Sequence, residues 1–151
     1  METPILELIL QDMERSLYGI KETAGYSTTV HVVERFRRTM FTENFPAVAL
    51  YCLREDTENE GNLIDAECRI AEVAAEGYIQ ERLPGRLDQE LVLFQCDLYT
   101  ALFEDPQWNG QAIDTLYGYV EKGMANTEGT VAYCTVHAQL RYRFPIGRPW
   151  G

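Results

Sequence analysis

The residues whose side chains could carry chemistry are few and scattered along the chain. The cysteines are Cys52, Cys68, Cys96 and Cys134, and the histidines are His31 and His137. Zinc sites usually show paired ligands at short spacing, and no Cys-x-x-Cys pair is present. Both histidines lie in strand-like apolar runs without the local signature of a Cys–His nucleophilic pair. We therefore expect buried, apolar cysteines and structural histidines, with no metal and no cofactor.

Carboxylates are concentrated in the polar stretch 54–62. They are Glu55, Asp56, Glu58 and Glu60. Such a group could bind calcium or magnesium, but the alternating ligands, central glycine and closing glutamate of an EF-hand are absent. We expect a solvated hairpin loop, whose carboxylates could face a partner.

Motifs for catalysis or phosphate binding are missing from the sequence. There is no glycine-rich nucleotide fingerprint, no P-loop, no nucleophile elbow and no zinc-protease helix motif. Only Ser16 and Ser27 are serines, and with 24 acidic residues some carboxylate pairs arise by chance. The pattern favours a binding or structural protein over an enzyme.

The charge balance excludes two classes of partner. Thirteen basic and 24 acidic residues in 151 give a net charge of −11 and a pI near 4.6. Such a chain would be repelled by duplex phosphates and by anionic membranes. No apolar run approaches the length of a membrane span, and the run Ile5–Leu10 follows Glu2 and is too short for a secretion signal. All basic residues except Lys21 and Lys122 are arginines, which suits protein–protein contacts.

Two segments have helical periodicity. Apolar residues recur every three or four positions from Ile5 to Ile20 and again from Leu87 to Leu102. Asp105-Pro106 ends the second segment. We predict one helix in each.

Five segments favour strands, namely 28–36, 47–53, 64–78, 113–120 and 130–144. In the third, the apolar parity changes after Ile70, which predicts a β-bulge, with a helical turn over 71–75 as the alternative. In the fourth, Tyr117 and Tyr119 are predicted on one side. The fifth alternates most regularly, with the even-numbered residues from Ala132 to Phe144 on one face. Its length predicts that it projects beyond the sheet and offers an edge for pairing.

The order of these elements predicts an α+β fold. We expect one mixed, mainly antiparallel sheet of four to five strands, with both helices packed on one face. Residues 1–144 form a single domain in this prediction. Residues 145–151 form a C-terminal extension, because Pro145 and Pro149 interrupt the last strand.

Four local sequences, in this order, resemble a known family. They are Asn44-Phe45-Pro46-Ala47-Val48, Ala74-Ala75-Glu76-Gly77, Ala101-Leu102-Phe103-Glu104-Asp105-Pro106 with Asn109-Gly110 beyond it, and Leu140-Arg141-Tyr142-Arg143. Together they span nearly the whole chain and resemble the tail terminator proteins of long-tailed phages, the group of the lambda-like minor tail protein U. Each motif is short, and their order and spacing carry the resemblance. The extension after Phe144 has no counterpart in it.

The resemblance implies a structural protein of the virion and no enzyme. Such proteins assemble in the host cytoplasm as a ring, commonly of six subunits, on the end of the tail tube. The ring stops tube polymerisation and presents a surface to the head-completion or connector protein. The implied partners are further copies of this chain, the tail tube protein and the connector protein. DNA would pass the acidic lumen without specific binding, and no membrane is involved.

Candidate interface residues follow from this expectation. Arg141 and Arg143 could meet acidic residues of the next subunit, and Phe144, Ile146 and Trp150 could anchor an interface, unless the tail packs back on its own domain. The carboxylates of residues 54–62 could face a partner or the lumen.

Three other functions fit the sequence. The first is another ring protein of the neck, such as a head-completion protein. The second is a small cytosolic ligand-binding domain or enzyme with a pocket between sheet and helices. The third is an inhibitor or immunity protein whose acidity mimics nucleic acid.

Overall fold

A single five-stranded sheet organises the chain. The computed structural model describes residues 2–58 and 63–150. The helices are α1 (Ile5–Tyr18) and α2 (Leu87–Phe103), with a short 3-10 helix η1 (Glu22–Ala24). The strands are β1 (Val32–Arg35), β2 (Ala47–Thr57), β3 (Ala66–Gln80), β4 (Asp114–Met124) and β5 (Val131–Pro145).

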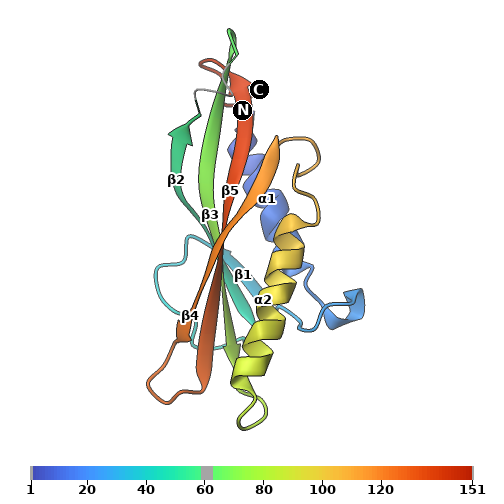
Figure 1. Cartoon of the computed structure of the whole chain (residues 1–151), viewed down its shortest axis with the longest axis vertical. Coiled ribbons are helices and arrows are strands. Elements are labelled where there is room, and N and C mark those ends of the chain that lie inside the picture. The colour runs from blue at the N-terminus through green and yellow to red at the C-terminus, as the bar shows by residue number, and fades with distance from the viewer. Residues whose placement is uncertain (1, 59–62, 151) are drawn as a thin grey trace.

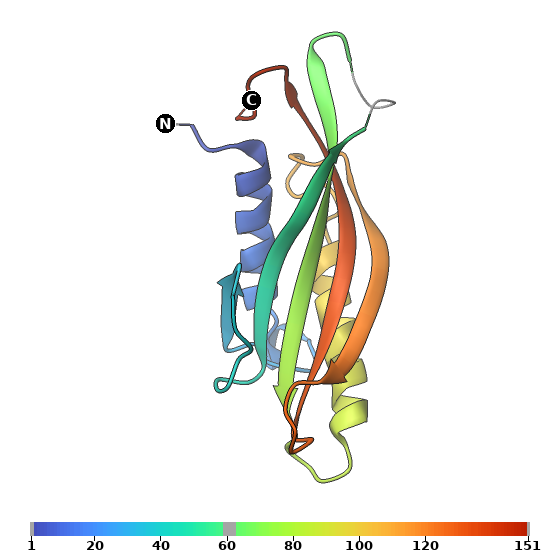
Figure 2. The same ribbon diagram turned by 90° about the vertical axis from the view of Figure 1, so that its left-hand side faces the viewer.

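The strands lie in the order β1-β2-β3-β5-β4. Only β1 and β2 are parallel, and the other neighbours are antiparallel. Both helices lie on the same side of the sheet (Figure 1), and Figure 2 shows the opposite face, which we call the open face. The predicted α+β fold, with a mixed, mainly antiparallel sheet and two helices on one face, is confirmed.

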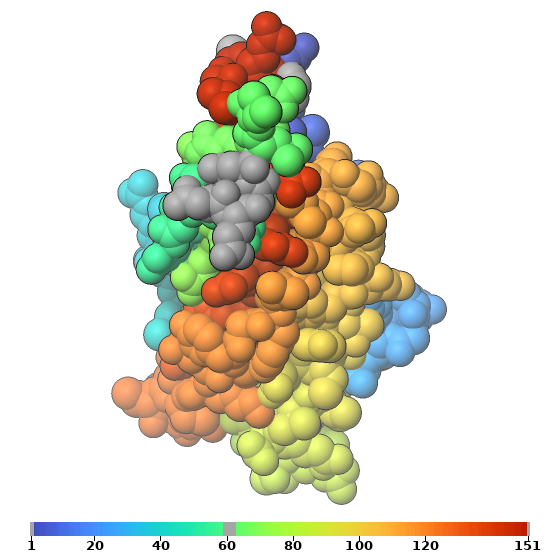
Figure 3. All heavy atoms as spheres, turned by 45° about the horizontal axis from the view of Figure 1, so that its top comes forward, coloured from blue at the N-terminus to red at the C-terminus, as the bar shows by residue number. Residues whose placement is uncertain are grey.

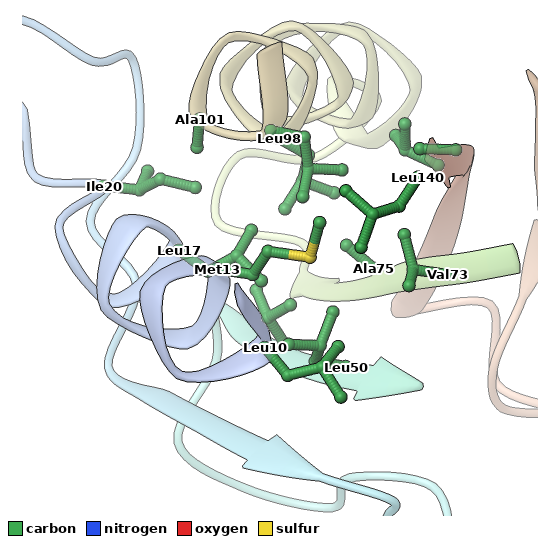
Figure 4. Close-up of a cluster of buried hydrophobic side chains, with 14 of the residues drawn as sticks. Leu10, Met13, Leu17, Ile20, Leu50, Val73, Ala75, Leu98, Ala101 and Leu140 are labelled. Atoms are coloured by element: carbon green, nitrogen blue, oxygen red, sulfur yellow. The ribbon is translucent and has the colours of Figure 1, made fainter. Parts of the chain in front are cut away.

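The main core lies between the helices and the sheet. Ile9, Met13 and Leu17 of α1 are fully buried, as the helical periodicity predicts. Figure 4 shows this stripe facing side chains of α2 and of the sheet, among them Leu98 and Leu140. Burying each such side chain contributes about 1.5–3 kcal/mol, so this contact holds the two layers together.

The predicted faces of β5 are confirmed. Its even-numbered residues join the core on the helix side, and they are Ala132, Cys134, Val136, Ala138, Leu140, Tyr142 and Phe144. The expectation that β5 offers an edge is wrong, because β5 lies between β3 and β4. Its pairing with β4 extends from Ala132 to Arg141, so only residues 142–145 project beyond that neighbour.

Strand β1 is shorter than the predicted strand 28–36. The buried carboxylate of Asp97 on α2 accepts hydrogen bonds from the backbone N–H groups of Ser27 (3.1 Å) and Thr28 (2.8 Å) and from the Thr28 hydroxyl (2.6 Å). The N–H of Val30 donates to the carbonyl of Ile20 at 2.9 Å, so these residues bond elsewhere and pairing with β2 starts at Val32.

The stretch predicted as an acidic loop is partly strand. Strand β2 continues to Thr57, because residues from Arg54 onwards pair with β3 after a register shift. Leu53 is the extra residue, and it forms the bulge that this shift requires. The predicted bulge in the third strand is therefore wrong. Strand β3 pairs with β5 without interruption from Ala66 to Gln80.

A second bulge twists β4. The register against β5 shifts between Tyr117 and Val120. At Gly118 a Cβ atom would lie 3.0 Å from the carbonyl oxygen of His137, so glycine permits this close approach. Because of the bulge, Tyr117 lies on the helix side, beside Tyr99 and Phe103 of α2, whereas Tyr119 lies on the open face. The prediction that the two tyrosines share a side is therefore wrong.

Candidate functional site

Arg141 forms ion pairs with two carboxylates of its own chain. Its guanidinium group donates two hydrogen bonds to Asp114, one of them from Nε to Oδ1 at 2.7 Å, and its Nη1 lies 3.3 Å from Glu58 Oε1. This contact lowers the pKa of the Asp114 carboxyl, because the bonded cation stabilises the carboxylate. Arg141 thus joins β5 to the first residue of β4 and to the end of β2, so an intersubunit pair would compete with these bonds. Arg143 is exposed on the same face, beyond the end of β4.

The three apolar residues proposed as anchors differ in burial. Phe144 lies within the core of the chain, next to Tyr142, and is therefore not an exposed anchor. Ile146 is 62% exposed and Trp150 is 45% exposed. The extension itself folds back, since the N–H of Ile5 donates to the carbonyl of Pro149 at 2.9 Å.

The predicted acidic cluster is dispersed. Glu55 lies on the helix side of β2, where it accepts a hydrogen bond from the Tyr142 hydroxyl. Asp56 lies on the open face and pairs with Arg54 at 2.5 Å, and Glu58 follows the strand and contacts Arg141. Glu60 lies outside the described residues. The described carboxylates bond separately to different side chains and do not form one surface.

His137 lies on the open face, between carboxylates. Its side chain is almost buried, and its ring stacks on Tyr119 with centroids 4.1 Å apart. Nε2 lies 3.3 Å from Glu121, and Nδ1 lies 3.7 Å from Glu72. In the described chain, its nitrogens therefore meet carboxylates and no hydroxyl or thiol, which a nucleophile–base pair would require.

The β4 side of the molecule exposes many apolar side chains. The outer edge of β4 pairs with no strand among those described, and Leu116, Tyr119 and Met124 are each about half exposed along it. On the helix side, Tyr117 packs edge-on against Tyr99, with centroids 5.5 Å apart. Figure 3 shows β4 (orange) and α2 (yellow) side by side on this surface. We call the outer side of β4 the β4 edge.

The edge of the sheet opposite β4 also exposes apolar groups. Phe36, just after β1, is 69% exposed, and Met40 and the bulge residue Leu53 are each 51% exposed. Arginines surround them. Arg37 pairs with Glu34 at 2.5 Å, and its guanidinium lies 3.9 Å from the ring centroid of Phe41. We call residues 32–54 the arginine edge.

The apolar residues of these two edges were not predicted as site residues. One signal for them was present in the sequence, because alternation cannot bury Leu116, Tyr117, Tyr119 and Val120 on one face. The exposure of Leu53 depends on the bulge in β2, and the sequence contains no sign of it.

A hollow of about 510 Å³ lies between the 27–31 segment, the end of β3 and α2. His31, Phe45 and Gln80 line part of it, together with Arg82 and Glu90, which are 4.0 Å apart.

Among the described residues, no three His, Cys, Asp or Glu side chains are grouped closely enough to hold a metal ion. Neither described helix has the length and apolar character needed to span a membrane. Comparison with known proteins finds no protein-family model and no curated protein that matches this chain.

Proposed function

We propose that this chain is a structural protein of a phage tail, which assembles into a ring on the end of the tail tube. The observation that carries the proposal is the outer edge of β4, a strand of 11 mostly exposed residues that pairs there with no strand in the described part of the chain. Proteins normally protect such edges with charges, prolines or a covering element, because another chain can pair there. Strand β4 has a bulge and the charged residues Asp114, Glu121 and Lys122, but Leu116, Tyr119 and Met124 are about half exposed along it, and such apolar exposure favours assembly.

The resemblance to tail terminators supports the choice of partners. In this role the ring binds the last layer of tube protein and stops further addition. Its other surface receives the head-completion or connector protein. The proposed role needs contacts and no catalysis, and the place of action is the neck region of the virion.

The charge of the chain fits passage of DNA. Six subunits with −11 each would give the ring a charge of −66. An acidic lumen repels phosphates, so DNA slides through without adhering. A basic lumen in the assembled ring would contradict this part of the proposal.

The test measures the mass of the protein in solution and its effect on the growth of tail tubes. Native mass spectrometry over a concentration range, with negative-stain images of the same samples, should give closed rings of one size. Tubes polymerised from a tail tube protein of a long-tailed phage should then stop growing when it is added, with rings at their ends. A protein that stays monomeric and leaves tube growth unchanged would overturn the proposal.

The same features also suit a ring protein of the neck that binds the portal. Binding to isolated portal complexes, with no effect on tube growth, would favour that function.

A ligand-binding domain is a separate candidate, favoured by the hollow of about 510 Å³ beside α2. A small molecule that raises the melting temperature of wild type would support it, if Gln80→Ala abolishes the shift.

A further inference from the structure

Asn109 and Gly110 lie in the loop that joins α2 to β4 (Figure 1), and they form the one Asn-Gly pair of the sequence. Both residues are exposed and have φ angles in the left-handed region, 60° at Asn109 and 81° at Gly110. An asparagine side chain loses ammonia when the backbone nitrogen of the next residue attacks its amide carbon. Glycine hinders this attack least, because it has no Cβ atom. Whether the reaction occurs in a folded protein depends on how the fold holds the two groups.

The fold leaves both reacting groups of this pair accessible. Among the described residues, the N–H of Gly110 has no hydrogen-bond acceptor, and Oδ1 of Asn109 has no donor. A Cβ atom at Gly110 would have no neighbour within 4 Å, so the space around the attacking nitrogen is open. One hydrogen bond holds the side chain of Asn109, from Nδ2 to Oδ2 of Asp12 at 3.2 Å.

Asn126 has the opposite arrangement and provides a reference within the same chain. Its Oδ1 accepts hydrogen bonds from the backbone N–H groups of Thr130 (3.0 Å) and Val131 (3.1 Å). Its Nδ2 donates to the Thr130 hydroxyl at 2.8 Å. These three bonds fix the amide, and the next residue, Thr127, is β-branched and stiff. The fold therefore protects Asn126 and leaves Asn109 open to the reaction.

We propose that Asn109 is a site of spontaneous deamidation in the folded protein. The nitrogen of Gly110 bonds to Cγ of Asn109, the bond from Cγ to Nδ2 breaks, and the proton of the Gly110 N–H leaves with the ammonia. Water then opens the resulting cyclic imide. Cleavage between Cγ and the Gly110 nitrogen gives aspartate, whereas cleavage between the Asn109 carbonyl carbon and that nitrogen gives isoaspartate. Water is the only co-reactant, and its oxygen enters the product.

The product changes the contact between this loop and α1. A carboxylate at residue 109 has no proton to donate to Asp12, whereas the amide of Asn109 donates one. A second carboxylate is also near, because Oδ2 of Asp105 accepts the backbone N–H of Asn109 at 2.7 Å. Like charges at such short range repel each other. Deamidation therefore replaces a bond to α1 by a repulsion.

The test follows the full chain in water enriched in heavy oxygen, folded in mildly alkaline buffer and unfolded in urea. Peptide mapping by mass spectrometry then locates the label, which enters only where an amide is lost during the incubation. In the folded chain, Asn109 should gain label several-fold faster than Asn126. Unfolding should accelerate labelling far more at Asn126 than at Asn109. The rate at Asn109 should rise with pH, because the attacking nitrogen must lose its proton.

Two variants serve as controls for the assignment. Asn109→Ser removes the amide and should abolish the label in this peptide. Gly110→Ala hinders the attacking nitrogen and should slow the labelling of Asn109, and circular dichroism verifies the fold of both variants. A folded wild-type chain in which Asn109 keeps its amide as long as Asn126 does would overturn the proposal.

The effect on α1 is tested separately by thermal melting. Asn109→Asp should melt at a lower temperature than Asn109→Ser, since both lack the amide donor to Asp12 and only the first adds a charge. The difference should shrink in an Asp12→Asn background. Equal melting of the two variants in the wild-type background would overturn the repulsion. These results are independent of the proposed ring, because they concern one chain in isolation.

Discussion

Gly77→Ala tests how closely α2 packs on the sheet. Gly77 lies in β3, and a Cβ atom there would lie 2.5 Å from Cε1 of Phe94 and 2.8 Å from Cδ1 of Leu98. Carbon atoms pack best at about 3.5–4.0 Å, so the methyl group needs roughly 1 Å more room than it has. Phe94 and Leu98 are both fully buried, and neither can move aside into solvent.

The expected cost is that of overpacking a core, about 1–3 kcal/mol of unfolding free energy. Alanine also restricts the unfolded chain, which offsets about 0.4–1 kcal/mol of this cost. A net loss of about 1–2 kcal/mol lowers the melting temperature by about 2–8 °C in a chain of this size. Urea unfolding followed by circular dichroism measures the free energy, and calorimetry measures the melting temperature.

Phe94→Leu provides the control, because it removes the ring that the new methyl group would strike. The cost of Gly77→Ala should be smaller in this background by about 1 kcal/mol, which a double-mutant cycle detects. Equal costs in the two backgrounds, or a Gly77→Ala protein as stable as wild type, would refute the packing described here.

Three further predictions follow from side-chain contacts and burial. In the native protein, buried Cys134 should react with iodoacetamide at least roughly 100-fold more slowly than exposed Cys96, because burial raises the pKa of the Cys134 thiol to about 12. Equal reaction rates of the two cysteines would contradict this burial. Asp114→Asn should cost about 0.5–1 kcal/mol at pH 7, because it breaks the charged pair with Arg141. Since the pKa of Asp114 is lowered in the folded state, this difference should persist down to the ordinary aspartate pKa of 3.8 and vanish as the pH falls further, as urea unfolding at several pH values would show; a constant difference at low pH would refute it. Deletion of residues 145–151 should lower the melting temperature by about 2–4 °C, because the tail is hydrogen-bonded to the first residue of α1; unchanged melting with unchanged assembly would leave the tail without a role.

The sequence by itself determined the elements with strong periodicity. The apolar stripes of α1 and α2 and the alternation of β5 each have one solution that buries them, so their faces were predicted correctly. The order of the elements then sufficed to predict an α+β fold with both helices on one face.

Only the tertiary structure decided the pairing of the strands. The alternation of β5 shows that one face is buried, but it does not show how many neighbours the strand has, and β5 lies inside the sheet. The bulge at Leu53 arises from the register of β2 against β3, which depends on residues distant in sequence. Likewise, the segment before β1 bonds to Asp97, which lies about 70 positions away.

The candidate site depended on the same long-range contacts. The sequence singled out Arg141 and Phe144 by residue type, whereas the fold uses the first to bind Asp114 and Glu58 and buries the second. The edge strands β1 and β4 are separate segments of the chain, and their placement at opposite ends of the sheet follows from the strand order. Local periodicity reports which side of an element is buried, and only the packing of all elements determines which surfaces remain open to a partner.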